Sequence, residues 1–119
     1  MEQRPNKEAI GSLKISEDVL ATIAKFAATE VEGVASLAPF VAPIKGFHPA
    51  KGKAIRIELN DDIAVIDLNV NLKFGAKVPQ VAEQIQSGVK ESVQNMTGIT
   101  VSKVNVTVAG IVFEEAAAQ

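Results

Sequence analysis

The sequence contains no cysteine, no tryptophan and no tyrosine, and it has one histidine, His48. Without cysteine the chain has no disulfide, no thiolate zinc site and no cysteine nucleophile, and the cytosol is the favoured compartment. A single histidine with no neighbouring thiol does not form a recognisable catalytic or metal-binding group. Five phenylalanines are the only aromatic residues, so the core must be aliphatic.

Long apolar runs and a strong charge bias are missing as well. No segment approaches the roughly 20 apolar residues that a membrane-spanning helix requires, and residues 1–7 lack the apolar stretch of a signal peptide. The formal net charge of −2 gives no general attraction to nucleic acid or anionic lipid. We therefore expect a cytoplasmic protein without direct membrane insertion, whose association with a membrane would be peripheral.

What remains is the composition of one globular domain. The chain has 119 residues, of which 47% are hydrophobic and 22% charged, and this is enough for a single core. We expect a disordered lead-in over residues 1–9, one domain over residues 10–113 and a polar tail over residues 114–119.

Two stretches have the spacing of amphipathic helices. Ser16 is a suitable N-cap for the first helix, which should end near Glu32 with Gly33 as its left-handed C-cap. Pro79 fits the first turn of the second helix, and Gly98 its C-cap. The apolar stripes that we expect to face the core are Val19, Leu20, Ile23, Phe26 and Ala27 on the first helix, and Val81, Ile85, Val89, Val93 and Met96 on the second.

Alternating apolar and polar residues predict the strands. The clearest pattern is a hairpin in which residues 60–62 form the turn and Gly75 ends the second strand. In the last strand the apolar parity changes at Ala109–Gly110, which indicates a β-bulge. The expected strands are Ile10–Ile15, Val34–Leu37, Ile55–Leu59, a strand starting at Ile63, and Val101–Phe113, with a long loop over Ala38–Gly52. This order predicts an α+β fold with a small mixed or antiparallel sheet and two helices packed on one face.

A search for catalytic chemistry gives structural explanations instead. Three acid pairs occur at a helix start, in a turn and in the tail, where no two carboxylates are placed for acid–base catalysis. These pairs are Glu17–Asp18, Asp61–Asp62 and Glu114–Glu115. The segment Gly46–Lys53 resembles a phosphate loop, but its spacing is one residue too long and Ala54 replaces the required hydroxyl. We predict no catalytic, cofactor-binding or metal-binding residue.

Two surfaces are candidates for interaction. Polar residues alternate outward on the two long strands and would form an amide-rich patch if these strands are neighbours; they are Asp67, Asn69, Asn71, Lys73, Lys103, Asn105 and Thr107. This patch is either a solvated face or a surface for docking or self-association. A second, basic group in and beside the loop consists of Lys45, Lys51, Lys53 and Arg56. It is either solvated or contacts an acidic partner, nucleic acid or lipid headgroups. Against nucleic acid, the chain has no GXXG clamp, and its strands offer no exposed aromatic platform.

The order of several motifs resembles a known family. They are GSLKIS (residues 11–16), EVEGV (30–34), DLNVNLKFG (67–75), VP (78–79) before a helix, MTG (96–98) and VNVTVAGIVF (104–113). Together they are similar to the alkaline shock protein family (Asp-twenty-three or Gls type) of Gram-positive bacteria. The resemblance covers residues 10–113, nearly the whole chain.

The resemblance implies a non-enzymatic protein of the envelope stress response. Such a protein would act as a scaffold or adaptor through protein–protein contacts and self-association, with a membrane-anchored partner in some members. Other members are associated with control of fatty-acid synthesis at acetyl-CoA carboxylase, so a regulator of that enzyme is an alternative. A nucleic-acid-binding module using the basic loop is a further alternative. The family supplies no catalytic residues, and its glycines (Gly33, Gly75, Gly98 and Gly110 here) fit requirements of the backbone.

Overall fold

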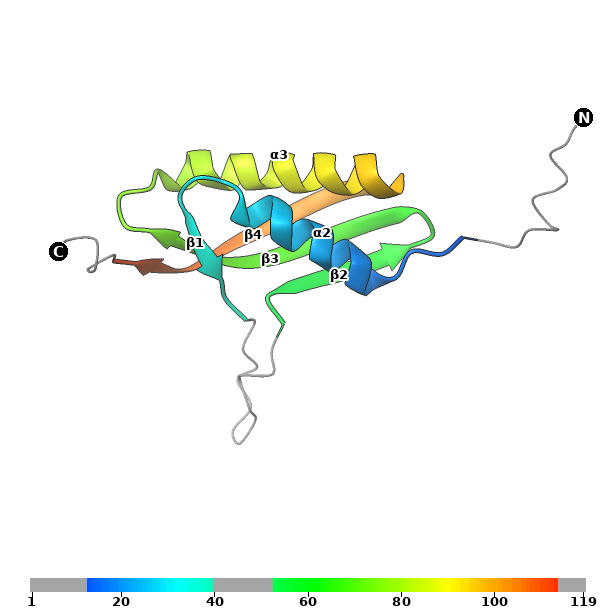
Figure 1. Ribbon diagram of the computed structural model, residues 1–119, viewed down its shortest axis with the longest axis horizontal. Helices are drawn as coiled ribbons and strands as arrows, with labels where there is room; N and C mark the ends of the chain where they lie inside the picture. Colours follow the sequence, from blue (N-terminus) through cyan, green and yellow to red (C-terminus); the bar gives the residue numbers. More distant parts are fainter. Residues whose placement is uncertain (1–12, 40–52, 114–119) are drawn as a thin grey trace, which may run out of the picture.

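The computed structural model describes residues 13–39 and 53–113 (Figure 1). These residues form two helices and a four-stranded sheet, in the order α2 (Glu17–Thr29), β1 (Val34–Leu37), β2 (Ile55–Asn60), β3 (Ile63–Lys73), α3 (Val78–Thr97) and β4 (Thr100–Val112). Residues 13–16 precede α2 without strand structure, so the part of the predicted strand Ile10–Ile15 that can be seen is not a strand. The lead-in, most of the loop and the tail lie outside the described residues.

Strand β3 is the centre of the sheet. β2 pairs with its first half as an antiparallel hairpin, and β1 pairs antiparallel with its second half along the same side. β4 runs parallel to β3 along the other side over the full length of β3. The sheet is therefore mixed, and α3 is the crossover connection that parallel neighbours require.

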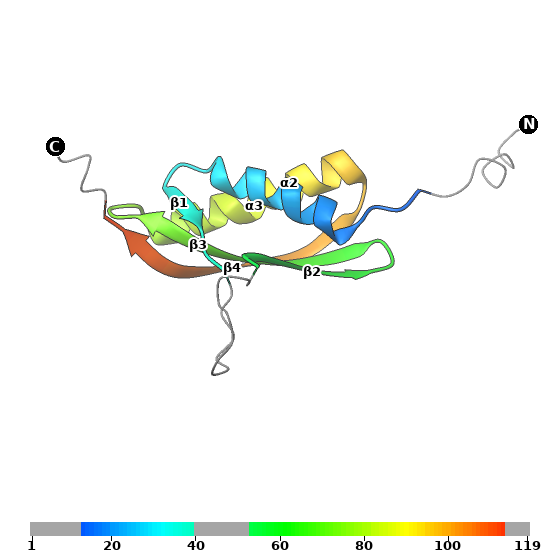
Figure 2. The same ribbon diagram turned by 60° about the horizontal axis from the view of Figure 1, so that its bottom comes forward.

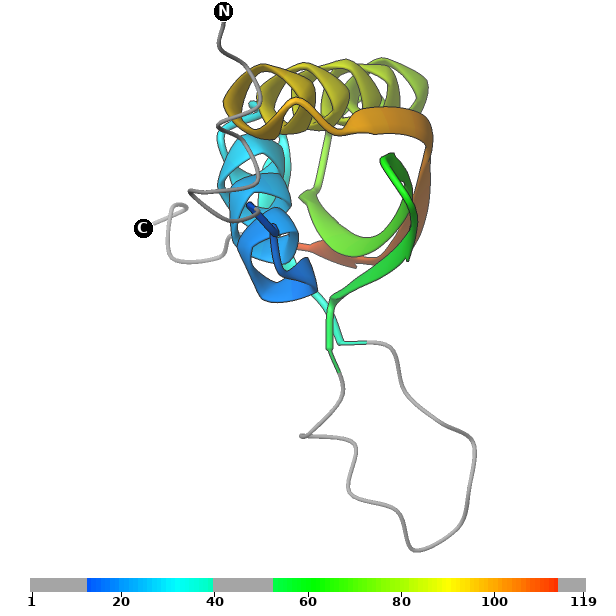
Figure 3. The same cartoon turned by 90° about the vertical axis from the view of Figure 1, so that its right-hand side faces the viewer.

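Both helices pack on one face of the sheet, as predicted (Figures 2 and 3). The core lies between these two layers and is aliphatic. Its fully enclosed side chains alternate along β3 and recur at helical spacing along α3, which are the periods of a strand and a helix with one buried face. The largest are Leu20, Ile66, Leu68, Val70, Leu72, Ile85, Val89, Val93 and Val101.

Helix α2 begins where predicted and ends earlier. The Val19 amide donates to Ser16 Oγ at 3.2 Å, which confirms the N-cap. The helix ends at Thr29 with Glu30 as its C-cap, so the prediction that Gly33 caps it was wrong. Gly33 instead forms the turn into β1 with φ of +104°, and a Cβ there would lie 2.9 Å from a methyl of Val81. Close packing against α3 and positive φ both require glycine at this position.

Three residues of the predicted apolar stripes are exposed. Val19 and Phe26 on α2 keep 46% and 60% of their surface accessible, and Met96 on α3 keeps 70%. Besides Leu20, α2 buries three alanines, Ala24, Ala27 and Ala28. Small side chains allow α2 to lie close to both α3 and the sheet, and in this packing Val19 and Phe26 are on the solvent side of the helix.

The predicted bulge in β4 is confirmed. Val108 is opposite Val70 and Gly110 is opposite Asn71, so Ala109 is the additional residue. A second register shift, at Ser102 between Val101 and Lys103, was not predicted.

Ile85→Ala should lower the free energy of unfolding by about 2–5 kcal/mol, because it leaves a cavity in a fully enclosed site. Met96→Ala on the same helix should change it by less than about 0.5 kcal/mol, because that side chain is exposed. Urea denaturation of the two variants measures both values. Equal losses of unfolding free energy in the two variants would contradict the exposure of Met96 and would favour the stripe predicted from the sequence, in which Met96 is buried.

Candidate interaction surfaces

The polar residues predicted to face outward lie on the side of the sheet opposite the helices. Because β3 and β4 are neighbours, Asp67 is opposite Asn105 and Asn69 is opposite Thr107. The Asn105 side-chain amide donates to Asp67 Oδ1 at 2.7 Å, and Asn71 donates to the Ser36 hydroxyl at 3.1 Å. The structure thus brings these residues together on one surface, which we call the open sheet face.

Six of the seven candidates are accessible on the open sheet face. Lys73, Lys103, Asn105 and Thr107 are exposed, and Asp67 and Asn71 are partly buried. No other helix or strand among the described residues covers this face (Figure 2). The seven candidates offer amides, one hydroxyl, one acid and two lysines, and the exposed Arg56 and Glu58 of β2 lie on the same side of the sheet.

Asn69 is the exception, because it is only 8% exposed. It holds together the two ends of the segment between β1 and β2. Its backbone oxygen accepts from Ala38 at 2.9 Å, its backbone amide donates to Ala54 at 3.0 Å, and its side-chain amide donates to the Pro39 oxygen at 3.3 Å. Asn69 Oδ1 is buried without a donor among the described residues. The sequence pattern placed Asn69 outward correctly but did not reveal this structural role.

The basic group is only partly visible. Lys45 and Lys51, like His48, lie outside the described residues. Lys53 is exposed just before β2, and Arg56 is exposed on β2 opposite Asp67.

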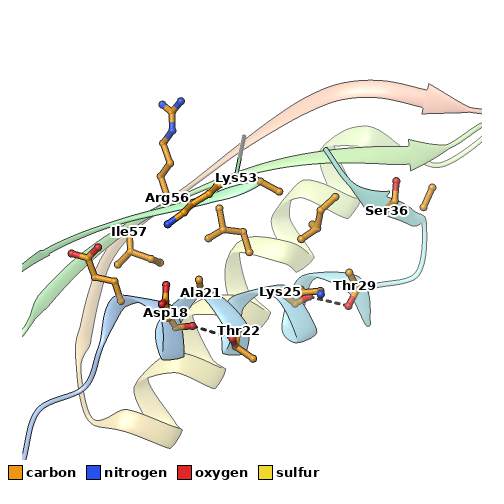
Figure 4. Close-up of a pocket in the computed structure, with 14 residues that line it drawn as sticks. Asp18, Ala21, Thr22, Lys25, Thr29, Ser36, Lys53, Arg56 and Ile57 are labelled. Carbon is orange, nitrogen blue, oxygen red and sulfur yellow. Dashed lines mark hydrogen bonds between the residues drawn. The ribbon is translucent and has the colours of Figure 1, made fainter. Parts of the chain in front are cut away.

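A groove runs between α2 and the side of β1 and β2 that faces away from β3 (Figure 4). Its volume is about 990 Å³. Glu17 and Asp18 line the groove at the start of α2, and Lys25, Lys53 and Arg56 line it as well. The Arg56 side chain points away from α2, toward the other side of the sheet (Figure 4). Small and apolar residues lie between them, among them Ala21, Thr22, Ala54 and Ile57. This groove was not predicted from the sequence, in which the only signal is the run of small and charged residues on the polar side of the first helix.

Across residues 13–39 and 53–113, no three histidine or acidic side chains gather as metal ligands would. The helices described here are too short or too polar to cross a membrane.

The fold and surfaces define a small α+β domain with a covered face and an open, polar face. Comparison with known proteins identifies the family: a model of the Asp-twenty-three family, described as having a cell envelope-related function, matches residues 5–113. The chain belongs to this family, which is the alkaline shock protein family that the motifs resemble.

Relatives of this chain occur in Gram-positive bacteria. Spy1535 of Streptococcus pyogenes is 38% identical over 109 residues, which cover 91% of this chain and 84% of that protein. YqhY of Bacillus subtilis is 32% identical over 108 residues, which cover 88% and 80%. Among solved structures, a copper form of a MamM CTD variant aligns with a TM-score of 0.50 at 15% identity, over 80% of this chain and 98% of that one. At that identity the likeness concerns the fold alone.

Asn69→Ala should lower the free energy of unfolding by about 1 kcal/mol, because the hydrogen bond to Pro39 is lost. Asn69→Asp should cost more, about 2 kcal/mol, because a carboxylate would be buried against that carbonyl oxygen. Asn105→Ala is the control on the exposed part of the same face and should cost less than about 0.5 kcal/mol. Urea denaturation measures all three, and equal effects at positions 69 and 105 would contradict the role assigned to Asn69.

Proposed function

We propose that this protein is a non-enzymatic adaptor of the cell envelope, which binds protein partners on its open sheet face and associates with itself. One observation carries the proposal: a chain of a cell envelope-related family presents a polar, paired surface that its own helices leave uncovered. Its place of action is the cytoplasmic side of the membrane, where a membrane-anchored protein recruits it.

The composition of the open sheet face supports docking of a protein. The Asp67–Asn105 hydrogen bond holds two side chains in place before a partner arrives, so less conformational entropy is lost on binding. Thr107 and Lys103 on β4 provide exposed donors beside this pair. A mixture of amides, hydroxyls and both charge signs suits a polar protein surface better than the uniformly negative backbone of a nucleic acid.

The absence of catalysis in this proposal rests on what the described surfaces hold. The groove beside α2 is lined by Glu17, Asp18, Lys25 and Lys53, and its other lining residues on α2, Ala21, Thr22 and Thr29, include no histidine or cysteine. The family's description concerns the envelope and names no reaction.

A photo-crosslinking residue placed at Thr107 in the native cell should form adducts with specific proteins, because this side chain is exposed on the open sheet face. The matched position is Glu91, which is exposed on α3 on the helix side and should give few adducts. Mass spectrometry identifies the partners, and Lys103→Glu should reduce the adducts at Thr107 several-fold. Carboxylase subunits among the partners would support the fatty-acid alternative.

Equal adducts from both positions, or adducts from Glu91 alone, would contradict docking on the open sheet face. Adducts with nucleic acid alone would contradict an adaptor of proteins and support the nucleic-acid module.

A further inference from the structure

Strand β2 forms an edge of the sheet, with no described strand beyond it. In an antiparallel pair, successive residues direct their backbone groups alternately toward and away from the partner strand. The hydrogen bond from the Asn69 amide to the Ala54 oxygen fixes this alternation. Three residues therefore direct their N–H and C=O groups to the free edge, and they are Ile55, Ile57 and Leu59.

The charges on this edge have an arrangement that fits a copy of itself. Arg56 and Glu58 are both exposed and lie on either side of Ile57. If a second β2 pairs antiparallel with Ile57 on the twofold axis, Arg56 of each copy is opposite Glu58 of the other. A shift that places Arg56 or Glu58 on the axis would put like charges opposite each other, which is unfavourable.

The same register satisfies the backbone and the side chains that face the helices. Ile57 pairs with Ile57 of the second copy, and Ile55 pairs with Leu59, so every outward N–H and C=O in the strand finds a partner. These apolar side chains lie on the helix side of the sheet, where they continue the core. Beyond the strand, Lys53 is brought near Asp61 of the second copy, which adds another pair of opposite charges.

Helix α2 repeats this self-complementarity on the other wall of the groove. Asp18 and Lys25 lie at similar distances along the helix on either side of Ala21 and Thr22 (Figure 4). Two α2 helices that run antiparallel across the same axis would therefore place Asp18 near Lys25 of the other copy, and the small residues at the centre allow a close approach. The groove of about 990 Å³ supplies the space into which the second copy fits.

We propose that two copies of this chain associate through β2, edge to edge, and form one continuous sheet across a twofold axis with their α2 helices antiparallel. This rests on the self-association in the proposed function and assigns it a surface and a register. Charged residues on an edge strand usually prevent such pairing; here their opposite signs and their spacing around Ile57 favour it. The other edge, β4, carries one charge, Lys103, and no acid, so nothing on it selects a register.

Charge exchange tests the pairing. Sedimentation equilibrium of the full chain up to about 1 mM should show a monomer–dimer equilibrium. Arg56→Glu and Glu58→Arg should each raise the dimer dissociation constant at least about tenfold, because two attractive contacts become repulsive. An equimolar mixture of these two variants should dimerise again, since each glutamate then faces an arginine, and the double variant R56E/E58R should also recover. Lys103→Glu is the matched single charge reversal on β4 and should leave the constant unchanged.

Several results would overturn this assignment: a strictly monomeric wild type, single variants that dimerise as tightly as the wild type, or a mixture that fails to recover. Both substituted side chains are exposed, and thermal unfolding by circular dichroism checks that each variant is folded. Crosslinking at Thr107 in the R56E background separates the two proposals. If R56E keeps the adducts at Thr107 and dimerises as tightly as the wild type, docking on the open sheet face is supported and pairing through β2 is overturned. If the wild type dimerises but gives no adducts at Thr107, docking on the open sheet face is overturned and pairing through β2 is supported.

Discussion

The pairing of β3 with every other described strand is the constraint on which the rest of the structure depends. β2 and β1 occupy one side of it in succession and β4 occupies the other, so its register determines which residues of those strands face the helices. Its own inward residues, from Ala64 to Leu72 at every second position, are completely buried. Because a shift of one residue would move that whole set to solvent, the apolar pattern of β3 specifies the register of the entire sheet.

This arrangement also makes the two faces of the domain unequal. Two helices on one face bury the aliphatic side chains, and the polar residues between them are left on the open sheet face as a hydrogen-bonded array. Asn69 belongs to the polar side of β3 but also has a structural role, because the chain leaves β1 and enters β2 beside it. Its backbone and side chain replace the interstrand bonds that the break between β1 and β2 removes. A polar residue in the middle of β3 is thus needed for the fold itself, while its neighbours remain available for contacts.

Local patterns predicted the elements better than they predicted which helix face is buried. The hairpin, the N-cap at Ser16, the C-cap at Gly98 and the bulge at Ala109 depend on residues close in sequence, and all were confirmed. The apolar stripes failed at Val19, Phe26 and Met96, which are exposed. Helical periodicity places those residues near the stripe, but the face that is buried depends on how closely α2 approaches α3 and the sheet. The alanines of α2 determine that approach, and hydrophobicity alone ranks them below phenylalanine and valine.

By itself the sequence determined the α+β class, the family and the outward direction of the polar residues on β3 and β4, because these follow from short periods and motif order. Only the tertiary structure decided that the two strands are neighbours, that Asp67 meets Asn105, and that Asn69 is buried. The same holds for the groove, whose walls come from α2 and β2, more than twenty residues apart in the chain. Contacts between distant segments depend on how the elements pack, and packing is a property of the whole core that no local pattern contains.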